Sequence, residues 1–158
     1  MRHERNGYAR SALLTLILAL CVMTVTGAET EQQGIGQPIT VYKTATCGCC
    51  QGWVDYLETQ GFRVQSHDVQ NLDEIKARNG LTDGRLKSCH TAIVDGYVVE
   101  GHVPADDIRR LLAQRPEIVG ITAPGMPSMS PGMNSLEPKG YDVLSFDARG
   151  NIEVFSRY

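Results

Sequence analysis

The 158-residue sequence has no excess of basic residues: 15 Lys and Arg stand against 18 Asp and Glu, giving a formal net charge of −3. Proteins that bind nucleic acids by covering phosphates need a basic surface, so this class is excluded. Charged residues make up only 21% of the chain and hydrophobic residues 42%, which excludes an extended disordered protein. Five cysteines are too few for a disulfide-dense miniprotein. The length suits one ordinary domain with an appendage.

Residues 1–28 have the pattern of a secretory signal. Basic residues come first, an apolar run spans 13–23, and small residues end the segment at Ala28. This order predicts cleavage after Ala28. An uncleaved membrane anchor is a weaker alternative, because the apolar run is short for a bilayer span. A lipid-attachment site at Cys21 is weaker still, because the bulky Leu20 precedes it.

After cleavage, we expect an exported protein without stable insertion in a membrane. Residues 29–37 are polar and lack an apolar period, which predicts a flexible leader, and residues 38–158 form the predicted domain. Four cysteines remain in an oxidising compartment, at positions 47, 49, 50 and 89. This even number suits either two disulfides or one metal cluster.

The hydrophobic pattern of the domain predicts alternating strands and helices. Helices are expected between the cysteines and Gly61, between Asn71 and Gly80, and from Pro104 onward. The stretch 121–139 is rich in Pro, Gly, Ser and Met and is expected to be a long loop. Strands are expected at 39–42, 62–69, 91–94, 97–100, 141–146 and 152–155.

This order of elements is that of a thioredoxin-like α/β domain: β-α-β-α-β-β-α, followed by the Met-, Pro- and Gly-rich loop and a C-terminal hairpin. The strand–helix–strand start predicts a right-handed crossover and a parallel pair of strands. Asp95-Gly96 is a typical two-residue hairpin turn, which adds antiparallel strands. The sequence therefore predicts a mixed central sheet with flanking helices.

Three of the cysteines lie within four residues, in Cys47-Gly48-Cys49-Cys50. The segment comes where the first predicted strand passes into the first helix. Unpaired N–H groups and the helix dipole stabilise thiolates at such a position and lower their pKa. Thiolates are both nucleophiles and soft-metal ligands, and Gly48 would leave room for a metal or a partner to approach.

Cys89-His90 opens the third predicted strand, which we expect to start at the same end of the sheet as the cysteine triplet. Cys89 would then complete a four-sulfur set, with His90 as a nitrogen ligand, an acid–base group or a neighbouring cation. The alternative is two disulfides, one within residues 47–50 and one to Cys89. A bridge that closes a loop of a few residues removes little chain entropy, so this alternative explains the triplet poorly.

Four sulfur ligands suit Cu(I), Zn(II) or an iron–sulfur cluster. Tetrahedral zinc sites usually take their ligands from two separated pairs, so the three-plus-one grouping makes zinc the less favoured metal. Met126, Met129 and Met133 shift the balance toward copper, because thioethers bind Cu(I) well and Zn(II) poorly. The same methionines can instead cover apolar surface on a flexible loop.

Two more histidines and a tryptophan are weaker candidates. His67 on the second predicted strand and His102 before the Pro104 helix are more typical of structural or exposed histidines than of ligands. His102 is the better of the two, because it lies near the third and fourth strands. Trp53, one turn after the cysteines, is expected in the core, where it can also shield the site from water.

Together these motifs resemble the CopG-type copper-resistance family, whose members were long filed as a domain of unknown function. The resemblance runs from about residue 39 to the end of the chain. It is carried by Tyr42-Lys43-Thr44-Ala45-Thr46-Cys47-Gly48-Cys49-Cys50, Gly52-Trp53-Val54, Ser88-Cys89-His90-Thr91-Ala92, the segment 96–104, Pro124-Gly125-Met126-Pro127 and Ser130-Pro131-Gly132-Met133.

The resemblance implies a periplasmic, thioredoxin-like protein, often encoded beside copper-efflux and copper-resistance genes, with copper at a cysteine cluster. Cys47, Cys49, Cys50 and Cys89 match the cysteines of the family, and His102 lies in its G-H-V-P segment. The resemblance also implies that the protein interconverts the redox states of copper while its cysteines cycle between thiol and disulfide.

Three functions stay open from the sequence. The first is a copper oxidoreductase in which Cys47, Cys50 and Cys89 carry the redox chemistry. The second is a chaperone or scavenger that passes Cu(I) to an efflux system without turnover. The third is general thiol–disulfide exchange on proteins, which is disfavoured because thioredoxin-like exchangers place a proline where Cys89-His90 stands. The full set of predicted copper ligands is Cys47, Cys49, Cys50, Cys89, His90, His102, Met126, Met129 and Met133.

Overall fold

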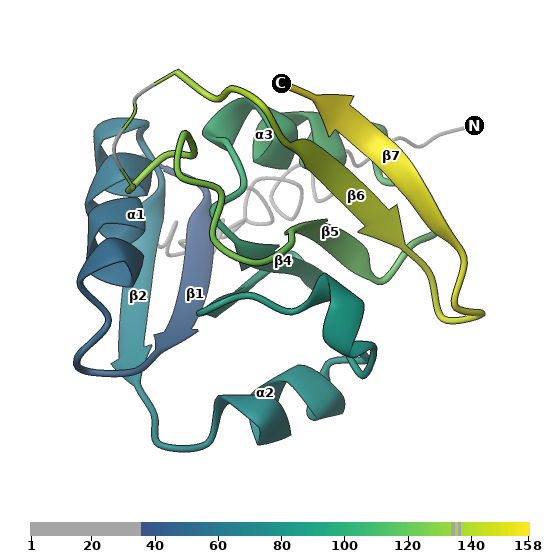
Figure 1. The fold of residues 1–158 in the computed structure, drawn as a ribbon, viewed down its shortest axis with the longest axis horizontal. Helices are drawn as coiled ribbons and strands as arrows, with labels where there is room; N and C mark the ends of the chain where they lie inside the picture. The colour runs from purple at the N-terminus through teal and green to yellow at the C-terminus, as the bar shows by residue number, and fades with distance from the viewer. Residues whose placement is uncertain (1–35, 134, 136) are drawn as a thin grey trace, which may run out of the picture. The chain divides into compact units, whose positions relative to one another are not determined.

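The computed structural model describes residues 36–133, 135 and 137–158. The predicted signal at 1–28 and most of the predicted leader at 29–37 lie outside these residues. The domain has one seven-stranded sheet in the order β2-β1-β3-β4-β5-β6-β7 (Figure 1). The strands are β1 Pro38–Lys43, β2 Arg63–Asp68, β3 Thr91–Val94, β4 Tyr97–Gly101, β5 Gly120–Ala123, β6 Asp142–Phe146 and β7 Ile152–Arg157. The helices are α1 Gly48–Thr59, α2 Leu72–Arg78 and α3 Ala105–Gln114, with a 3₁₀ turn at Gly84–Leu86.

The predicted mixed α/β class is confirmed by the pairing of the strands. β1 runs parallel to β2 and β4 parallel to β5, whereas the other neighbours are antiparallel. Asp95 and Gly96 both have positive φ, 48° and 84°, as the predicted two-residue hairpin between β3 and β4 requires. β6 and β7 form the predicted C-terminal hairpin.

The expectation of a loop from residue 121 was wrong at its start. Residues 120–123 form β5, which lies between β4 and β6 and is buried along its whole length. A short strand buried on both faces shows no alternation of polar and apolar residues, so its period gives no signal. Gly120 is required there, because a Cβ would lie 2.0 Å from the carbonyl oxygen of Val98.

Local signals at the helix ends agree with the structure. The side chain of Asn71 accepts a hydrogen bond of 3.2 Å from the backbone N–H of Glu74, so the predicted N-cap of α2 is confirmed. Gly61 and Gly80, which follow α1 and α2, have φ of 84° and 82°, the left-handed conformation that ends helices. Cys47 is the N-cap residue of α1, which places the cysteine triplet at a helix start.

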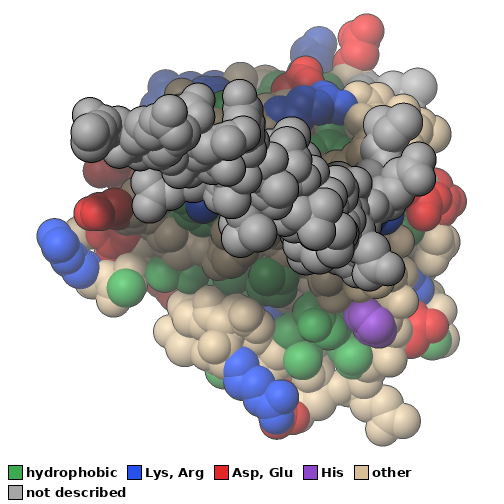
Figure 2. Space-filling view, turned by 180° about the vertical axis from the view of Figure 1, so that it is seen from behind, with side chains coloured by type: hydrophobic (Ala, Val, Ile, Leu, Met, Phe, Trp, Pro, Cys, Tyr) green, Lys and Arg blue, Asp and Glu red, His purple; other side chains and the backbone are tan. Residues whose placement is uncertain are grey.

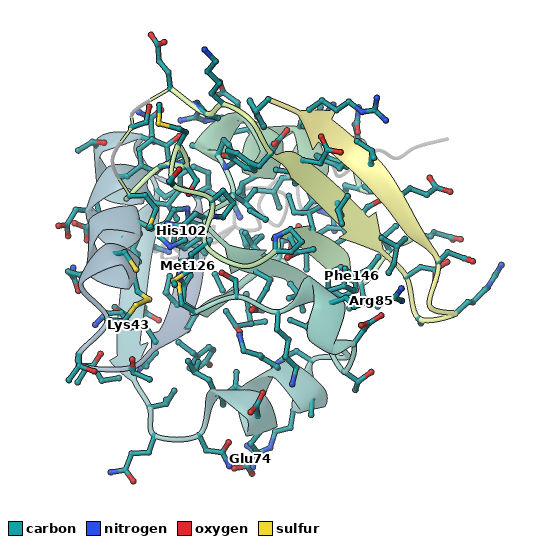
Figure 3. The ribbon with its side chains drawn as sticks, viewed as in Figure 1. Lys43, Glu74, Arg85, His102, Met126 and Phe146 are labelled. Carbon is teal, nitrogen blue, oxygen red and sulfur yellow. A yellow bond between two sulfur atoms is a disulfide. The ribbon has the colours of Figure 1, made fainter. Side chains whose placement is uncertain are left out.

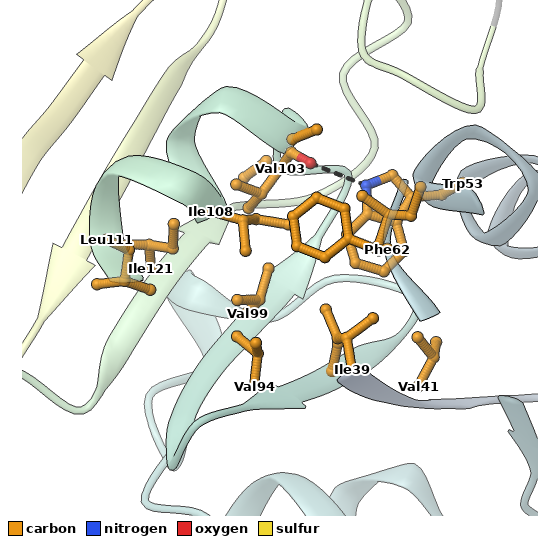
Figure 4. Packing of buried hydrophobic residues seen from close by; sticks show 14 of the residues in the cluster. Ile39, Val41, Trp53, Phe62, Val94, Val99, Val103, Ile108, Leu111 and Ile121 are labelled. Atoms are coloured by element: carbon orange, nitrogen blue, oxygen red, sulfur yellow. Dashed lines mark hydrogen bonds between the residues drawn. The ribbon is translucent and has the colours of Figure 1, made fainter. Parts of the chain in front are cut away.

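The two faces of the sheet are covered by different elements. α1 and α3 pack on one face, where Trp53, Leu57, Ile108 and Leu111 are buried against β-strand residues (Figure 4). A smaller cluster on the other face contains Leu81 and Leu86, from the segment after α2, together with Val98 and Phe146. Burial of this apolar surface is the main force that holds the domain together.

The antiparallel pairing of β1 with β3 brings two distant segments together. Tyr42, near the end of β1, lies opposite Thr91, the first residue of β3. The loop that follows β1 and the loop that precedes β3 therefore meet at the same end of the sheet, as the sequence predicted.

None of the helices among the described residues is long and apolar enough to cross a membrane. On the face shown in Figure 2, acidic and basic side chains of the described residues are interspersed among apolar ones.

Candidate metal centre

The structure brings the four cysteines of the domain into one cluster. The sulfur atoms of Cys47, Cys49, Cys50 and Cys89 all lie within 4.8 Å of one another. Three come from the start of α1 and the fourth from the loop before β3. Cys50 is buried and the other three are half-buried, so the cluster sits at the surface with one side closed by protein.

Cys47 and Cys50 form a disulfide, whereas Cys49 and Cys89 are free. The Sγ of Cys49 lies 3.5 Å from that of Cys47, and the Sγ of Cys50 lies 3.6 Å from the carbonyl oxygen of Cys89. The alternative of two disulfides was therefore right about a bridge within residues 47–50 and wrong about a second bridge to Cys89.

Cys89 has two imidazole nitrogens next to its sulfur. Its Sγ lies 3.4 Å from Nδ1 of His90 and 3.3 Å from Nε2 of His102. Burial, with a smaller contribution from the neighbouring Cys49, raises the pKa of the Cys89 thiol to about 11. In the absence of a metal, Cys89 is therefore a protonated thiol at neutral pH.

The protonation of His102 is determined by the backbone of Pro131. Nδ1 of His102 lies 2.8 Å from the carbonyl oxygen of Pro131, and a carbonyl can only accept, so Nδ1 carries the hydrogen. Nε2 therefore presents a lone pair to the sulfur of Cys89. Burial lowers the pKa of His102, which keeps the ring neutral near pH 7. A backbone carbonyl on the far nitrogen is one of the usual partners that orient a metal-binding histidine in proteins.

His90 is fully buried, and its Nε2 has no hydrogen-bond partner among the described residues. Its ring centroid lies 4.5 Å from that of Trp53 and 4.9 Å from that of His102. Burial lowers the pKa of His90 well below its usual range, and the charges of His102 and Lys76 act in the same direction. Cys89, His90 and His102 thus form a second group of three possible ligands that shares Cys89 with the cysteine cluster.

The segment 130–133 is pressed against the first turns of α1. A Cβ on Gly52 would lie 2.7 Å from the carbonyl oxygen of Gly132, and a Cβ on Gly132 would lie 2.4 Å from the backbone nitrogen of Trp53. Gly132 also has a φ of 82°. The two glycines therefore allow the close approach that brings the carbonyl of Pro131 to His102.

The three predicted methionine ligands lie at different places. Gly125 forms an isolated β-bridge with Ser88, the residue before Cys89. Met126 is the next residue in the chain after Gly125, and it is 59% exposed. Figure 3 labels Met126, which lies on the segment that follows β5. Met129 lies on an exposed turn. Met133 lines a cleft of about 470 Å³ whose described lining contains no cysteine.

The remaining candidates lie as the sequence predicted. His67 is exposed on β2 and stacks on Tyr42, with ring centroids 5.6 Å apart. Trp53 is fully buried and donates a hydrogen bond of 2.9 Å from Nε1 to the carbonyl oxygen of Val103. It therefore belongs to the core and also packs on His90, behind the metal centre.

A buried ion pair next to this centre was not predicted from the sequence. Nζ of Lys76 lies 2.5 Å from Oε1 of Glu100, and both side chains are almost completely buried. Two signals pointed to the pair: Lys76 follows Ile75 on the apolar side of α2, and Glu100 interrupts the apolar run of β4. Charged residues are rarely buried unless they are paired.

Comparison with known proteins agrees with this geometry. Two solved structures, "Copper resistance protein copG- Form 1" and "Copper resistance protein copG- Form 2", match with a TM-score of 0.72 and 40% sequence identity. Each match covers 78% of this chain and 98% of the other. The chain belongs to the CopG family. The family model described as "Protein of unknown function, DUF411" matches residues 86–133 of this CopG homologue. No curated protein matches it.

Membership of the CopG family confirms the resemblance found in the sequence. The protein is a homologue of a copper resistance protein, and its cysteine cluster has the composition of a metal site. Four sulfurs with two imidazole nitrogens make a soft donor set that suits copper by its ligand chemistry.

Proposed function

We propose that this CopG homologue holds copper at Cys47, Cys49, Cys50 and Cys89 and interconverts Cu(II) and Cu(I) through the Cys47–Cys50 pair. One observation carries the proposal: two of the four clustered sulfurs form a disulfide, and the other two are free thiols beside it. The same sulfurs can therefore either bond to each other or bind a metal, and the choice depends on their oxidation state.

The proposed reaction balances without another redox partner. The thiolates of Cys47 and Cys50 give up one electron each, the disulfide forms, and two Cu(II) ions become two Cu(I) ions. If the cysteines start as thiols, two protons are released as well. In the reverse direction two Cu(I) ions give two electrons, the disulfide opens, and two Cu(II) ions form. Interconversion of Cu(II) and Cu(I) is therefore a single reaction that can proceed in either direction.

Cys89, His90 and His102 can bind copper both when Cys47 and Cys50 are thiols and when these two form the disulfide. Cys89 is not part of the disulfide, so it can remain bound to copper while Cys47 and Cys50 react. Its proton must leave before the sulfur can bind a metal. The lone pair on Nε2 of His102 lies 3.3 Å from this sulfur, where it can accept the proton or bind copper as a nitrogen ligand. His90 offers a second imidazole at the same sulfur.

A thiol count during copper reduction tests this proposal. The reduced, metal-free protein, prepared without oxygen, would receive Cu(II) in the presence of a chromogenic Cu(I) chelator. We expect two thiols to disappear for every two Cu(I) ions formed, and mass mapping to find the new disulfide between Cys47 and Cys50. Cys47→Ser should abolish both changes. Cu(I) formation that continues unchanged in Cys47→Ser would contradict the proposed role of the pair.

The exposed side chain of Met126 favours a second candidate function, transfer of Cu(I) without turnover. Met126 is 59% exposed and directly follows Gly125, which bridges to Ser88 beside Cys89. A thioether at this place can bind Cu(I) weakly as the ion enters or leaves. Under this candidate, Met126→Leu slows transfer of bound Cu(I) to a competing chelator, and Met129→Leu serves as the control. Tight binding with no thiol consumption would favour transfer over redox turnover.

The place of action is part of the proposal. The predicted secretory signal and the disulfide both suit the periplasm, where disulfides persist. Copper ions are the proposed ligand, and components of a copper-efflux or copper-resistance system are the proposed protein partners. Cleavage after Ala28 and recovery of the protein in a periplasmic extract would support this location, whereas an uncleaved chain in the membrane fraction would refute it.

A further inference from the structure

The buried ion pair between Lys76 and Glu100 is hydrogen-bonded to Ser88 and Thr91, the residues on either side of the Cys89-His90 dipeptide. We propose that Lys76 and Glu100 are positioning residues that hold Cys89 and His90 in the geometry needed to bind copper. The inference rests on the proposed function, because it assigns these residues a role at the same metal centre. Neither side chain is among the possible metal ligands described above.

Hydrogen bonds from this pair reach the chain on both sides of the dipeptide. Oε1 of Glu100 accepts from the backbone N–H of Ser88, at 2.5 Å, and Oε2 accepts from the hydroxyl of Thr91, at 2.7 Å. Nζ of Lys76 also donates to the Thr91 hydroxyl, at 2.9 Å. The residue before Cys89 and the residue after His90 are therefore tied to one carboxylate.

The strand that carries Glu100, β4, also contacts the dipeptide through its own backbone. The carbonyl of His90 accepts a hydrogen bond of 3.0 Å from the backbone N–H of Gly101, the residue after Glu100. A Cβ on Gly101 would lie 2.5 Å from the hydroxyl of Ser88, so the loop packs tightly over this glycine. His102 comes next in the chain. Glu100 and His102 therefore contact the Cys89 loop from one short stretch of backbone.

Stability alone does not account for this pair. A buried ion pair must offset the cost of removing two charges from water, and replacement by apolar residues of similar size is often neutral or stabilising. The Lys76–Glu100 pair is buried on both sides, with side-chain exposures of 4% and 0%. What an apolar pair could not supply is the two acceptor atoms that hold Ser88 and Thr91.

Two double variants separate positioning from packing. Lys76→Met with Glu100→Leu removes both charges and both acceptor atoms. Lys76→Met with Glu100→Gln also removes both charges, but the amide oxygen can still accept from Ser88 and the amide nitrogen can donate to Thr91. Measurements on each purified protein are Cu(I) affinity against a chromogenic chelator, the midpoint of thermal unfolding, and the alkylation rate of Cys89 in the metal-free disulfide form.

We expect the Leu variant to bind Cu(I) about tenfold or more weakly than the original protein, because loss of groups that orient metal ligands typically costs 10–100-fold in affinity. The alkylation rate of Cys89 in the Leu variant should also differ from the rate in the original protein. The Gln variant should recover most of the affinity and the original alkylation rate. Thr91→Val removes one of the two hydrogen bonds to Glu100 and should have an intermediate effect on Cu(I) affinity. This variant serves as the test if the Leu variant does not fold.

A surface ion pair provides the matched control. Lys87 and Asp73 join the same loop to the same helix through a contact of 2.7 Å, but both are more exposed, at 30% and 77%. Asp73→Asn with Lys87→Gln should leave Cu(I) affinity and Cys89 alkylation unchanged.

Three outcomes would overturn the inference: a Leu variant that binds like the original protein, Leu and Gln variants that lose affinity equally, or a loss of affinity that only follows the unfolding midpoint. If the original protein itself fails to bind Cu(I), the proposed function falls. The alkylation rates of Cys89 still decide whether Lys76 and Glu100 position its sulfur, because that measurement needs no metal.

Discussion

Nε2 of His102 lies 3.3 Å from the sulfur of Cys89, and the ring is held in this orientation by the backbone carbonyl of Pro131 on its other nitrogen. Three segments far apart in the sequence therefore meet at one imidazole. His102, which the sequence ranked as a weak ligand, is thus a residue whose lone pair points at the free thiol of Cys89. This contact makes His102 the first residue to test.

His102→Asn should weaken Cu(I) binding by about tenfold or more, since it removes the nitrogen that faces Cys89. The asparagine amide can still donate toward Pro131, so the fold should be retained. Competition with a chromogenic Cu(I) chelator measures the effect. His67→Asn, at an exposed position on β2, is the matched control and should bind as the original protein does. Equal affinities for the two variants would show that His102 has no part in binding.

Gly52→Ala should lower the free energy of unfolding by about 1–3 kcal/mol, the usual cost of overpacking. The new methyl group would lie 2.7 Å from the carbonyl oxygen of Gly132, so the segment 130–133 must move away from α1. We expect Cu(I) affinity to fall as well, because the carbonyl of Pro131 moves with this segment. Urea unfolding and chelator competition measure the two effects.

Gly48→Ala is the control for that substitution, because a Cβ on Gly48 meets no atom within 4 Å. Gly48 lies at the start of the same helix, and alanine is the better helix former by up to about 1 kcal/mol. Its stability should therefore be unchanged or higher. A loss of stability as large as that of Gly52→Ala would mean that the close contact with Gly132 is not the cause.

Trp53→Phe should destabilise the protein by about 2 kcal/mol, because it leaves the buried carbonyl of Val103 without its donor and removes packing against His90. Urea unfolding, followed by circular dichroism, gives the free energy. Val154→Ala, at a side chain that is 43% exposed, should change it by less than about 0.5 kcal/mol. If both variants unfold at the same urea concentration, the Trp53 hydrogen bond contributes little.

The reactivity of Cys89 should depend steeply on pH in the metal-free disulfide form. Burial raises the pKa of this thiol from 9.0 to about 11, so its thiolate fraction should rise about tenfold per pH unit between pH 8 and pH 10. Alkylation followed by peptide mass mapping gives the rate. Because the folded protein holds this proton more tightly than the unfolded chain, its stability should also fall as the pH rises from about 9 to 11. A rate that levels off below pH 9 would contradict the raised pKa.

The features that the sequence predicts correctly have a cause that is local or follows from topology. The Asn71 cap and the Asp95-Gly96 turn depend on residues next to each other in the chain. The meeting of Cys89 with the triplet followed from the predicted thioredoxin-like order of elements, and the antiparallel pairing of β1 with β3 accounts for it in the structure. The mixed sheet, and the element order apart from β5, depend on the same kind of evidence.

The features of the fold and the site that were not predicted depend on contacts that no local pattern encodes. The bond from His102 to Pro131 joins residues 29 positions apart, and nothing in the S-P-G-M segment indicates which of its carbonyls would be used. The pairing of Cys47 with Cys50 was one of several possible bridges among four cysteines. β5 was missed because complete burial removes the alternation by which strands are recognised.

The pairing of β1 with β3 has a consequence for the folding of a copper-loaded chain. Cys50 and Cys89 are 39 residues apart in the sequence and meet only when these two strands are joined. A copper ion shared between them would bridge a loop of this length in the folded protein, whereas the unfolded chain does not hold the two sulfurs together and would bind the ion more weakly. Under the proposed function, copper binding and folding are therefore thermodynamically linked, and each stabilises the other.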